Sequence, residues 1–163
     1  MKIGPLLAHL RELEKALAAE LRAAAERHRD EHDVYHQCHT FALQCERHAR
    51  ALEPHATRYG EEVDDDLGPG LWSGLLERVR HQTSALVGRE PPSGLLLLSD
   101  LRALFLAAEE ASITWVMAGQ AALAARDSQL LETVTECHTE TELQVKWLTT
   151  RIKVGAPQAL VVG

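Results

Sequence analysis

The chain has 163 residues and a formal net charge of −7, which excludes the overall basic character of most proteins that bind nucleic acids or anionic membranes. Only 4% of the residues are aromatic, and alanine and leucine dominate the apolar ones, a composition that favours helices over strands. No apolar run approaches the roughly 20 residues of a membrane span. We therefore expect a single all-α domain over residues 1–163, with no nucleic-acid or membrane partner.

The start of the chain and its cysteines indicate a cytoplasmic protein. Met1 to Pro5 leads directly into an amphipathic pattern rather than into the apolar core of a signal peptide. An odd number of cysteines is typical of reduced thiols; they are Cys38, Cys45 and Cys137. All three lie on apolar helical stripes, which favours inert, buried side chains over catalytic thiols.

The apolar spacing predicts a first helix over about 5–29 and a second over about 33–59. A polar turn separates them, and either Asp30 or Asp33 can cap the second helix. Pro54 lies inside the second helix and is expected to bend it. Gly60 is expected to end it.

An acidic, glycine-rich linker over 60–70 and a short helix over 71–88 follow. The pattern then predicts a long helix over about 94–125, capped by Ser93, and a last helix over about 128–154 that stops at Gly155 before Pro157. The apolar tail can dock on the bundle or on a neighbour. About 34 residues between the second and third long helices are enough to cross a bundle, as in ferritin-like folds.

Two stretches carry a resemblance to a known superfamily: Arg27–Tyr35 at the first turn and Glu140–Trp147 in the last helix. With the helix layout, they make the chain resemble the ferritin-like superfamily, and most of all its small bacterial bundles. The resemblance implies a four-helix bundle with a long crossover that contains an extra helix. It also implies a possible iron or manganese centre.

Cys38-His39-Thr40 in the second helix recurs as Cys137-His138-Thr139 in the last one. A pseudo-twofold relation between two helical hairpins, as in ferritin-like bundles, would explain this repeat. A chance match between alanine-rich helices would explain it equally well.

Di-iron and di-manganese bundles need one Glu from each of two helices and a Glu-x-x-His from each of the others. The pattern is incomplete here, because Ala49 stands where Glu46 would need its histidine. The remaining mid-helix candidates are Glu14 or Glu20, Glu46, Glu109, His138 and Glu142. They form either a variant metal site (Glu14, Glu46, Glu109, His138, Glu142) or a set of solvated charges and interhelical ion pairs.

Histidines and tryptophans suggest further sites. On a continuous helix a row of histidines can chelate a metal, but the expected turn between His32 and His36 breaks the row His28, His32, His36 and His39. Trp115 is expected in the core. Trp72 and Trp147 lie away from it, and mark either a dimer interface or the packing of the crossover helix over Trp147.

Three functions follow from these patterns. The first is a non-enzymatic ferritin-like bundle that serves a binding or scaffold role as a homodimer. The second is a variant metal-binding relative, holding iron, manganese or zinc, with oxidoreductase or storage activity. The third is a bundle that binds an apolar ligand beside small residues of the third long helix, namely Ala108, Ser112, Gly119 and Ala122.

Overall fold

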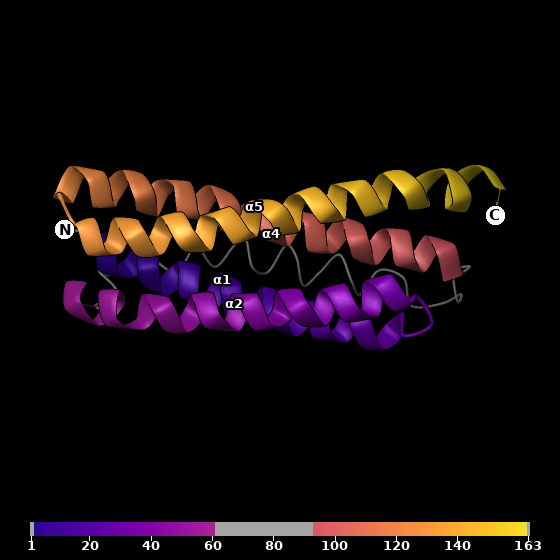
Figure 1. The fold of residues 1–163 in the computed structure, drawn as a ribbon, viewed down its shortest axis with the longest axis horizontal. Coiled ribbons are helices and arrows are strands. Elements are labelled where there is room, and N and C mark those ends of the chain that lie inside the picture. The colour runs from indigo at the N-terminus through magenta and orange to yellow at the C-terminus, as the bar shows by residue number, and fades with distance from the viewer. Residues whose placement is uncertain (1, 61–92, 163) are drawn as a thin grey trace.

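The computed structural model describes residues 2–60 and 93–162, which form four long α-helices (Figure 1). These are α1 (Ile3–Arg27), α2 (His32–Tyr59), α4 (Ser93–Ala125) and α5 (Ser128–Pro157), followed by the short π-helix η2 (Gln158–Val162). The expected all-α class is confirmed for this part of the chain. The acidic linker after Gly60 and the short helix over 71–88, with Trp72, lie outside the described residues. Within the described ranges, no helix has both the length and the apolar character needed to cross a bilayer.

The helices form two antiparallel hairpins, α1–α2 and α4–α5, whose turns lie at opposite ends of the bundle (Figure 1). At one end, His28 Nε2 of the first turn lies 2.7 Å from Asp100 Oδ2 near the start of α4. At the other end, the Tyr59 hydroxyl of α2 donates to Asp127 Oδ2 beside the second turn, at 2.7 Å. α2 and α4 therefore run in the same direction, and Gly60 and Ser93 lie at opposite ends.

The expected cap of α2 is wrong. The helix begins at His32, and its N-cap, Glu31, makes no side-chain capping hydrogen bond. Instead, Arg151 of α5 donates to Asp33 Oδ2 at 2.8 Å and to Glu31 Oε2 at 3.0 Å. The acidic residues of this turn bind a guanidinium on the other hairpin and leave the helix terminus uncapped.

The expected end of the last helix is also wrong, because α5 continues through Gly155 and Pro157 into η2. The reason is a tertiary contact. A Cβ placed on Gly94 would lie 3.6 Å from the Cβ of Ala159, so the tail packs closely on the start of α4. One of the two expected places for the tail, the bundle itself, is thus confirmed, although Leu160, Val161 and Val162 remain exposed.

The apolar stripes meet in two buried clusters, one on each side of the bundle's midpoint. One contains Leu17, Leu21, Leu101 and Leu148, and the other Leu7, Leu10, Leu52, Trp115 and Leu130. The predicted burial of Trp115 and of all three cysteines is confirmed. Between the clusters the interior is polar, and this layer contains the candidate site.

In the first hairpin, the start of α1 packs closely against the end of α2, and this contact can be tested. A Cβ on the buried Gly4 would overlap the carbonyl oxygen of Gly60, so Gly4→Ala should lower the free energy of unfolding by about 1–3 kcal/mol. As a matched control, Gly155→Ala places its methyl group no closer than 4.0 Å to another side chain and should stabilise α5 by about 0.5–1 kcal/mol. Urea unfolding monitored by circular dichroism measures both; a Gly4→Ala chain as stable as the wild type would refute the packing.

Candidate functional site in the middle of the bundle

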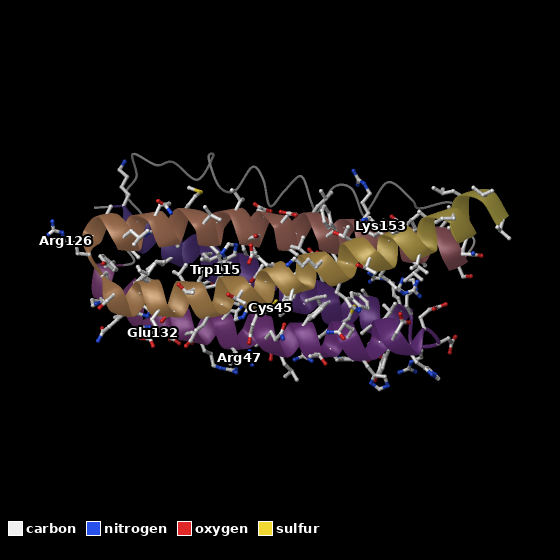
Figure 2. All side chains as sticks on the ribbon, turned by 45° about the horizontal axis from the view of Figure 1, so that its top comes forward. Cys45, Arg47, Trp115, Arg126, Glu132 and Lys153 are labelled. Carbon is white, nitrogen blue, oxygen red and sulfur yellow. The ribbon has the colours of Figure 1, made fainter. Side chains whose placement is uncertain are left out.

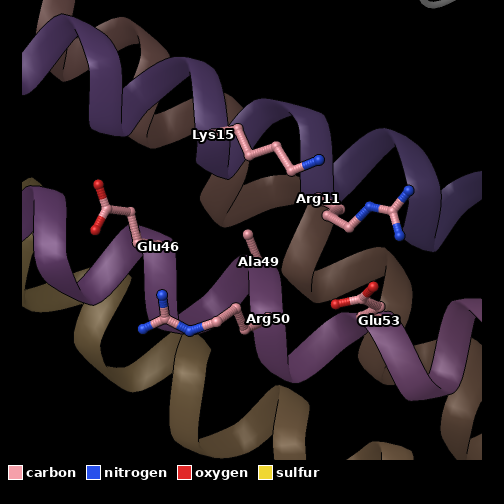
Figure 3. A pocket seen from close by; sticks show the side chains of 6 residues that line it. All are labelled: Arg11, Lys15, Glu46, Ala49, Arg50 and Glu53. Carbon is pink, nitrogen blue, oxygen red and sulfur yellow. The ribbon is translucent and has the colours of Figure 1, made fainter.

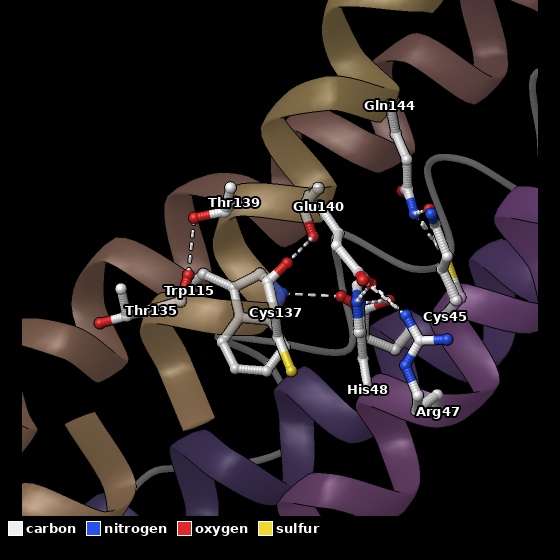
Figure 4. Close-up of polar contacts among 12 residues, drawn as sticks. Cys45, Arg47, His48, Trp115, Thr135, Cys137, Thr139, Glu140 and Gln144 are labelled. Carbon is white, nitrogen blue, oxygen red and sulfur yellow. Dashed lines mark hydrogen bonds and ion pairs between the residues drawn. The ribbon is translucent and has the colours of Figure 1, made fainter. Parts of the chain in front are cut away.

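One polar layer joins all four helices halfway along the bundle (Figure 4). α1 contributes Glu14, α2 contributes His48, α4 contributes Trp115 and α5 contributes Glu140. Glu14, His48 and Trp115 are at most 1% exposed, whereas Glu140 is partly buried. Each helix thus places one polar group at the level where the two apolar clusters separate.

Glu14 is a fully buried carboxylate with two different partners. The indole Nε1 of Trp115 donates to its Oε1 at 2.7 Å, and its Oε2 lies 3.3 Å from Nδ1 of His48. A buried carboxylate is costly unless its oxygens are paired. Trp115 therefore does more than fill space, because it links α4 to the charge on α1.

His48 lies between two carboxylates. Its Nδ1 faces Glu14, and its Nε2 lies 2.7 Å from Oε2 of Glu140. Arg47, the preceding residue on α2, donates to both oxygens of Glu140 at 2.6 and 2.5 Å. The ring of His48 also meets the edge of the Trp115 ring, with centroids 5.9 Å apart.

This geometry favours a charged imidazole, with Nδ1 at ion-pair distance from Glu14 Oε2, although the two atoms do not meet hydrogen-bond geometry. A neutral ring carries one N–H, so one of its nitrogens would present a lone pair to a carboxylate, whereas the imidazolium can donate in both directions. Burial lowers the pKa of His48, but Glu14 and Glu140 raise it by more, and the pKa lies above its ordinary value of 6.5. For Glu140 the directions are reversed. Burial raises its pKa, but His48 and Arg47 lower it by more and hold it below its ordinary range. Two negative and two positive side chains thus offset one another within the layer.

Burial disfavours the thiolate form of all three cysteines. Burial raises the pKa of Cys38 and that of Cys137 to about 12, and it also raises the pKa of Cys45. Cys45 Sγ lies 3.8 Å from Oε1 of Gln144, whose Nε2 donates to Gln44 at 3.0 Å. Since the thiolate is the nucleophile and the metal ligand, this environment disfavours both roles.

Of the five residues expected to hold a metal, only Glu14 belongs to this layer. Glu46 faces α1, where it accepts from Nη2 of Arg22 at 2.7 Å. It lines a groove of about 320 Å³ between α1 and α2 (Figure 3), together with Arg11, Lys15, Ala49, Arg50 and Glu53. Figure 3 shows Ala49 between Glu46 and Glu53, at the position where a Glu-x-x-His motif would carry its histidine.

The other three candidates lie elsewhere. Glu109 and Glu142 are exposed, and His138 Nε2 lies 3.1 Å from the Ser112 hydroxyl. Within residues 2–60 and 93–162, no three His, Cys, Asp or Glu side chains are grouped so that they could hold a metal ion. The structure therefore does not bring the expected set together.

The histidines at the first turn are arranged differently from the prediction. The turn lies between His28 and His32, so His32 and His36 share α2. His28 is buried beside Asp100, and His39 lies 3.3 Å from Glu26 on α1. The row of histidines is therefore broken between His28 and His32, and not between His32 and His36 as expected.

The repeated Cys-His-Thr motif occupies comparable places in the two hairpins. Cys38 and Cys137 are both buried. The histidine that follows each cysteine contacts the first helix of its own hairpin: His39 contacts Glu26, and His138 contacts Ser112. This is the placement that a pseudo-twofold relation would give.

The small residues considered for an apolar ligand lie in two different environments. Ala108 and Ala122 are fully buried. Gly119 lines a surface groove of about 310 Å³ between α4 and α5, whose other residues include Val116, Leu123, Val134 and His138. The groove is open to the surface along α4 and α5, and nothing in its lining tests the third hypothesis.

His48, Glu140 and Arg47 were not among the residues singled out from the sequence as a site. A usable signal for His48 exists, because it follows Cys45 by three positions and precedes Leu52 by four. Such spacing places a titratable side chain at the edge of an apolar stripe. Glu140 opens one of the two stretches that carry the ferritin-like resemblance.

Removing the imidazole tests its structural role. His48→Ala leaves one oxygen of Glu14 buried without its partner, and removing one member of a buried charge pair costs about 3–5 kcal/mol of unfolding free energy. The matched control is His39→Ala, which breaks a partly exposed pair with Glu26 and should cost less than about 1 kcal/mol. Denaturant unfolding measures the unfolding free energy of both variants. If both lose an equally small amount, His48 does not stabilise the bundle as we infer.

The charge of His48 predicts a specific dependence of stability on pH. Because its pKa is raised in the folded state, its stabilising contribution is fully present below 6.5 and is lost as the pH rises through the folded-state pKa. His48→Gln, which does not titrate, should lack this loss. Thermal unfolding of both chains from pH 6 to pH 9 measures the difference, and parallel curves would show that the ring is neutral in the folded protein.

Comparison with known proteins returns no match to a family model, a curated protein or a solved structure. The functional conclusion therefore rests on the geometry of the described residues.

Proposed function

We propose that this chain is a non-enzymatic, ferritin-like helical bundle that serves a binding or scaffold role in the cytoplasm as a homodimer. The observation that carries the proposal is the internal charge balance of the mid-bundle layer. Glu14 and Glu140 are neutralised by His48 and Arg47, and no added cation is needed to offset them.

The direction of the helices supports the ferritin-like layout. α2 and α4 run in the same direction. Gly60, which follows α2, and Ser93, which begins α4, lie at opposite ends of the bundle (Figure 1). A bundle with one long crossover has this arrangement, whereas a plain up-down bundle with short loops does not.

The contacts of the acidic residues support a role without metal chemistry. Carboxylates that project into a bundle serve as metal ligands when they can share a cation. Here the imidazole of His48 lies between the two carboxylates of the layer, and Glu46 is paired with Arg22 on the outside of the bundle. A variant iron, manganese or zinc centre is the competing function, and no contact among the described residues favours it.

The surface of α4 supports self-association. Residues 111–125 contain no charged side chain, yet they expose Ile113, Val116, Met117 and Leu123 by 40–58%. Uncharged helical surface of this kind is typical of protein interfaces.

Elemental mass spectrometry of the untagged protein tests the absence of a metal centre. After growth in medium supplemented with iron, manganese and zinc, we expect far less than one metal ion per chain, because the layer is already neutral. About two iron or manganese ions per chain would contradict the proposal and establish the metal-binding alternative.

Light scattering coupled to size-exclusion chromatography tests the homodimer. We expect a mass near twice 18.0 kDa at tens of micromolar chain, because the exposed apolar side chains of α4 favour burial against a partner. A mass of one chain over the whole accessible concentration range would contradict it.

A further inference from the structure

The outer face of α5 is electrically polarised along its length. Residues 128–142 contain Glu132, Glu136, Glu140 and Glu142 and no Lys or Arg. Residues 143–162 contain Lys146, Arg151 and Lys153 and no Asp or Glu. Figure 2 shows Glu132 and Lys153 on opposite halves of the helix.

Five of these seven charges form no ion pair with the part of the chain that the structure describes. Glu140 is paired with Arg47 and His48, and Arg151 with Glu31 and Asp33. The remaining five are exposed, and the structure gives them no ion pair within residues 2–60 and 93–162. They are Glu132, Glu136, Glu142, Lys146 and Lys153.

Four of these charges, Glu132, Glu136, Lys146 and Lys153, share one face of the helix with Thr139, Leu143 and Thr150, because together these positions are three or four residues apart. Glu142 lies at the edge of this face, about 100° around the helix from Leu143. Leu143, 57% exposed, lies on the same face, between the acidic and the basic half. The face thus has an apolar centre, an acidic end and a basic end.

Small residues fill the spaces between the charges. Thr135, Thr139 and Thr150 are exposed, and each donates its hydroxyl hydrogen to the backbone carbonyl four positions earlier. Since these hydroxyls are satisfied on their own helix, the face offers methyl groups to a neighbour and permits close approach.

We propose that this face binds the same face of a second copy, with the two α5 helices antiparallel about a twofold axis near Leu143. A helix with one acidic and one basic half is complementary to itself only when antiparallel. A parallel pair would place like charges together. With the axis near Leu143, Lys153 of the second copy lies level with position 133, between Glu132 and Glu136. Its Lys146 lies level with position 140, about 3 Å along the axis from Glu142. The inference rests on the proposed homodimer and specifies its interface.

The size of the face sets the expected strength of the pair. A helix of 30 residues is about 45 Å long and about 10 Å wide, which gives roughly 450 Å² per copy. A standard stable interface buries about 800 Å² per partner, so neighbouring apolar residues such as Val116, Leu123 and the exposed tail have to contribute the rest. We therefore expect an association that depends on protein concentration and weakens as salt screens the exposed charges.

Charge reversal in the full-length chain tests the interface. Lys146→Glu with Lys153→Glu makes the face wholly acidic, and Glu132→Lys with Glu136→Lys makes it basic apart from Glu142. Because a twofold interface contains each substitution twice, we expect either double variant to raise the dimer Kd at least about tenfold in sedimentation equilibrium. A mixture of the two variants should associate again, as should the chain that carries all four reversals.

Matched controls keep folding and association separate. All four positions are exposed and form no ion pair within the described ranges 2–60 and 93–162, so circular dichroism and melting temperature should match the wild type. Glu53→Lys, an exposed reversal on α2 in the groove beside α1, should leave the Kd unchanged. If the reversals on α5 also leave it unchanged, the homodimer stands and this interface is wrong; if the wild type has no dimer, the proposed function fails as well.

Disulfide trapping tests the orientation. Leu143→Cys lies at the proposed axis and should form a disulfide-linked dimer on mild oxidation. Thr135→Cys alone should not, because an antiparallel pair separates the two copies of this position by about 25 Å. The native cysteines are buried and need no replacement. Cross-linking through Thr135→Cys, with or without cross-linking through Leu143→Cys, would indicate a parallel pair and overturn the proposal, because only a parallel pair brings the two copies of position 135 together.

Discussion

The ring of His48 lies between two carboxylates from different hairpins, Glu14 on α1 and Glu140 on α5. Together with the bond from Trp115 to Glu14, these contacts connect all four helices at one level. The apolar clusters on either side supply most of the burial, but hydrophobic contact is non-directional and tolerates sliding. Hydrogen bonds between charged groups are directional and costly to leave unmade. We infer that the polar layer sets the register in which the two hairpins pack.

The same layer explains why the middle of the bundle is a poor place for chemistry. Its carboxylates are paired with His48 and Arg47, and its thiols are held protonated by burial. A metal or substrate would have to displace these contacts and leave charged groups unpaired. The groups that remain available are on the surface: the uncharged part of α4 and the polarised face of α5. We therefore infer that the interior stabilises the bundle and that the outer faces of α4 and α5 bind the partner.

The all-α class and the positions of the four long helices could be predicted from apolar spacing, as could the burial of Trp115 and the cysteines, because these depend on local pattern and side-chain type. Features that depend on contacts between distant residues could not. α5 passes its expected end because Ala159 packs on Gly94, and the acidic turn binds Arg151 instead of capping α2. Glu46 follows Cys45 directly, so it lies about 100° around the helix from that buried residue and faces Arg22. His48 lies at the edge of its stripe, and its partners are on other helices, which one helix's pattern does not reveal.

Measuring the protonation of His48 in the folded protein tests the central claim most directly. In ¹⁵N-labelled protein at pH 7, the account predicts that both ring nitrogens of His48 carry hydrogen, with imidazolium-type chemical shifts that persist above the ordinary pKa of 6.5. His48→Gln identifies the signals by their loss. A neutral ring at pH 7, with one bare nitrogen, would contradict the account, because the two carboxylates would then lack the charge that holds the layer together.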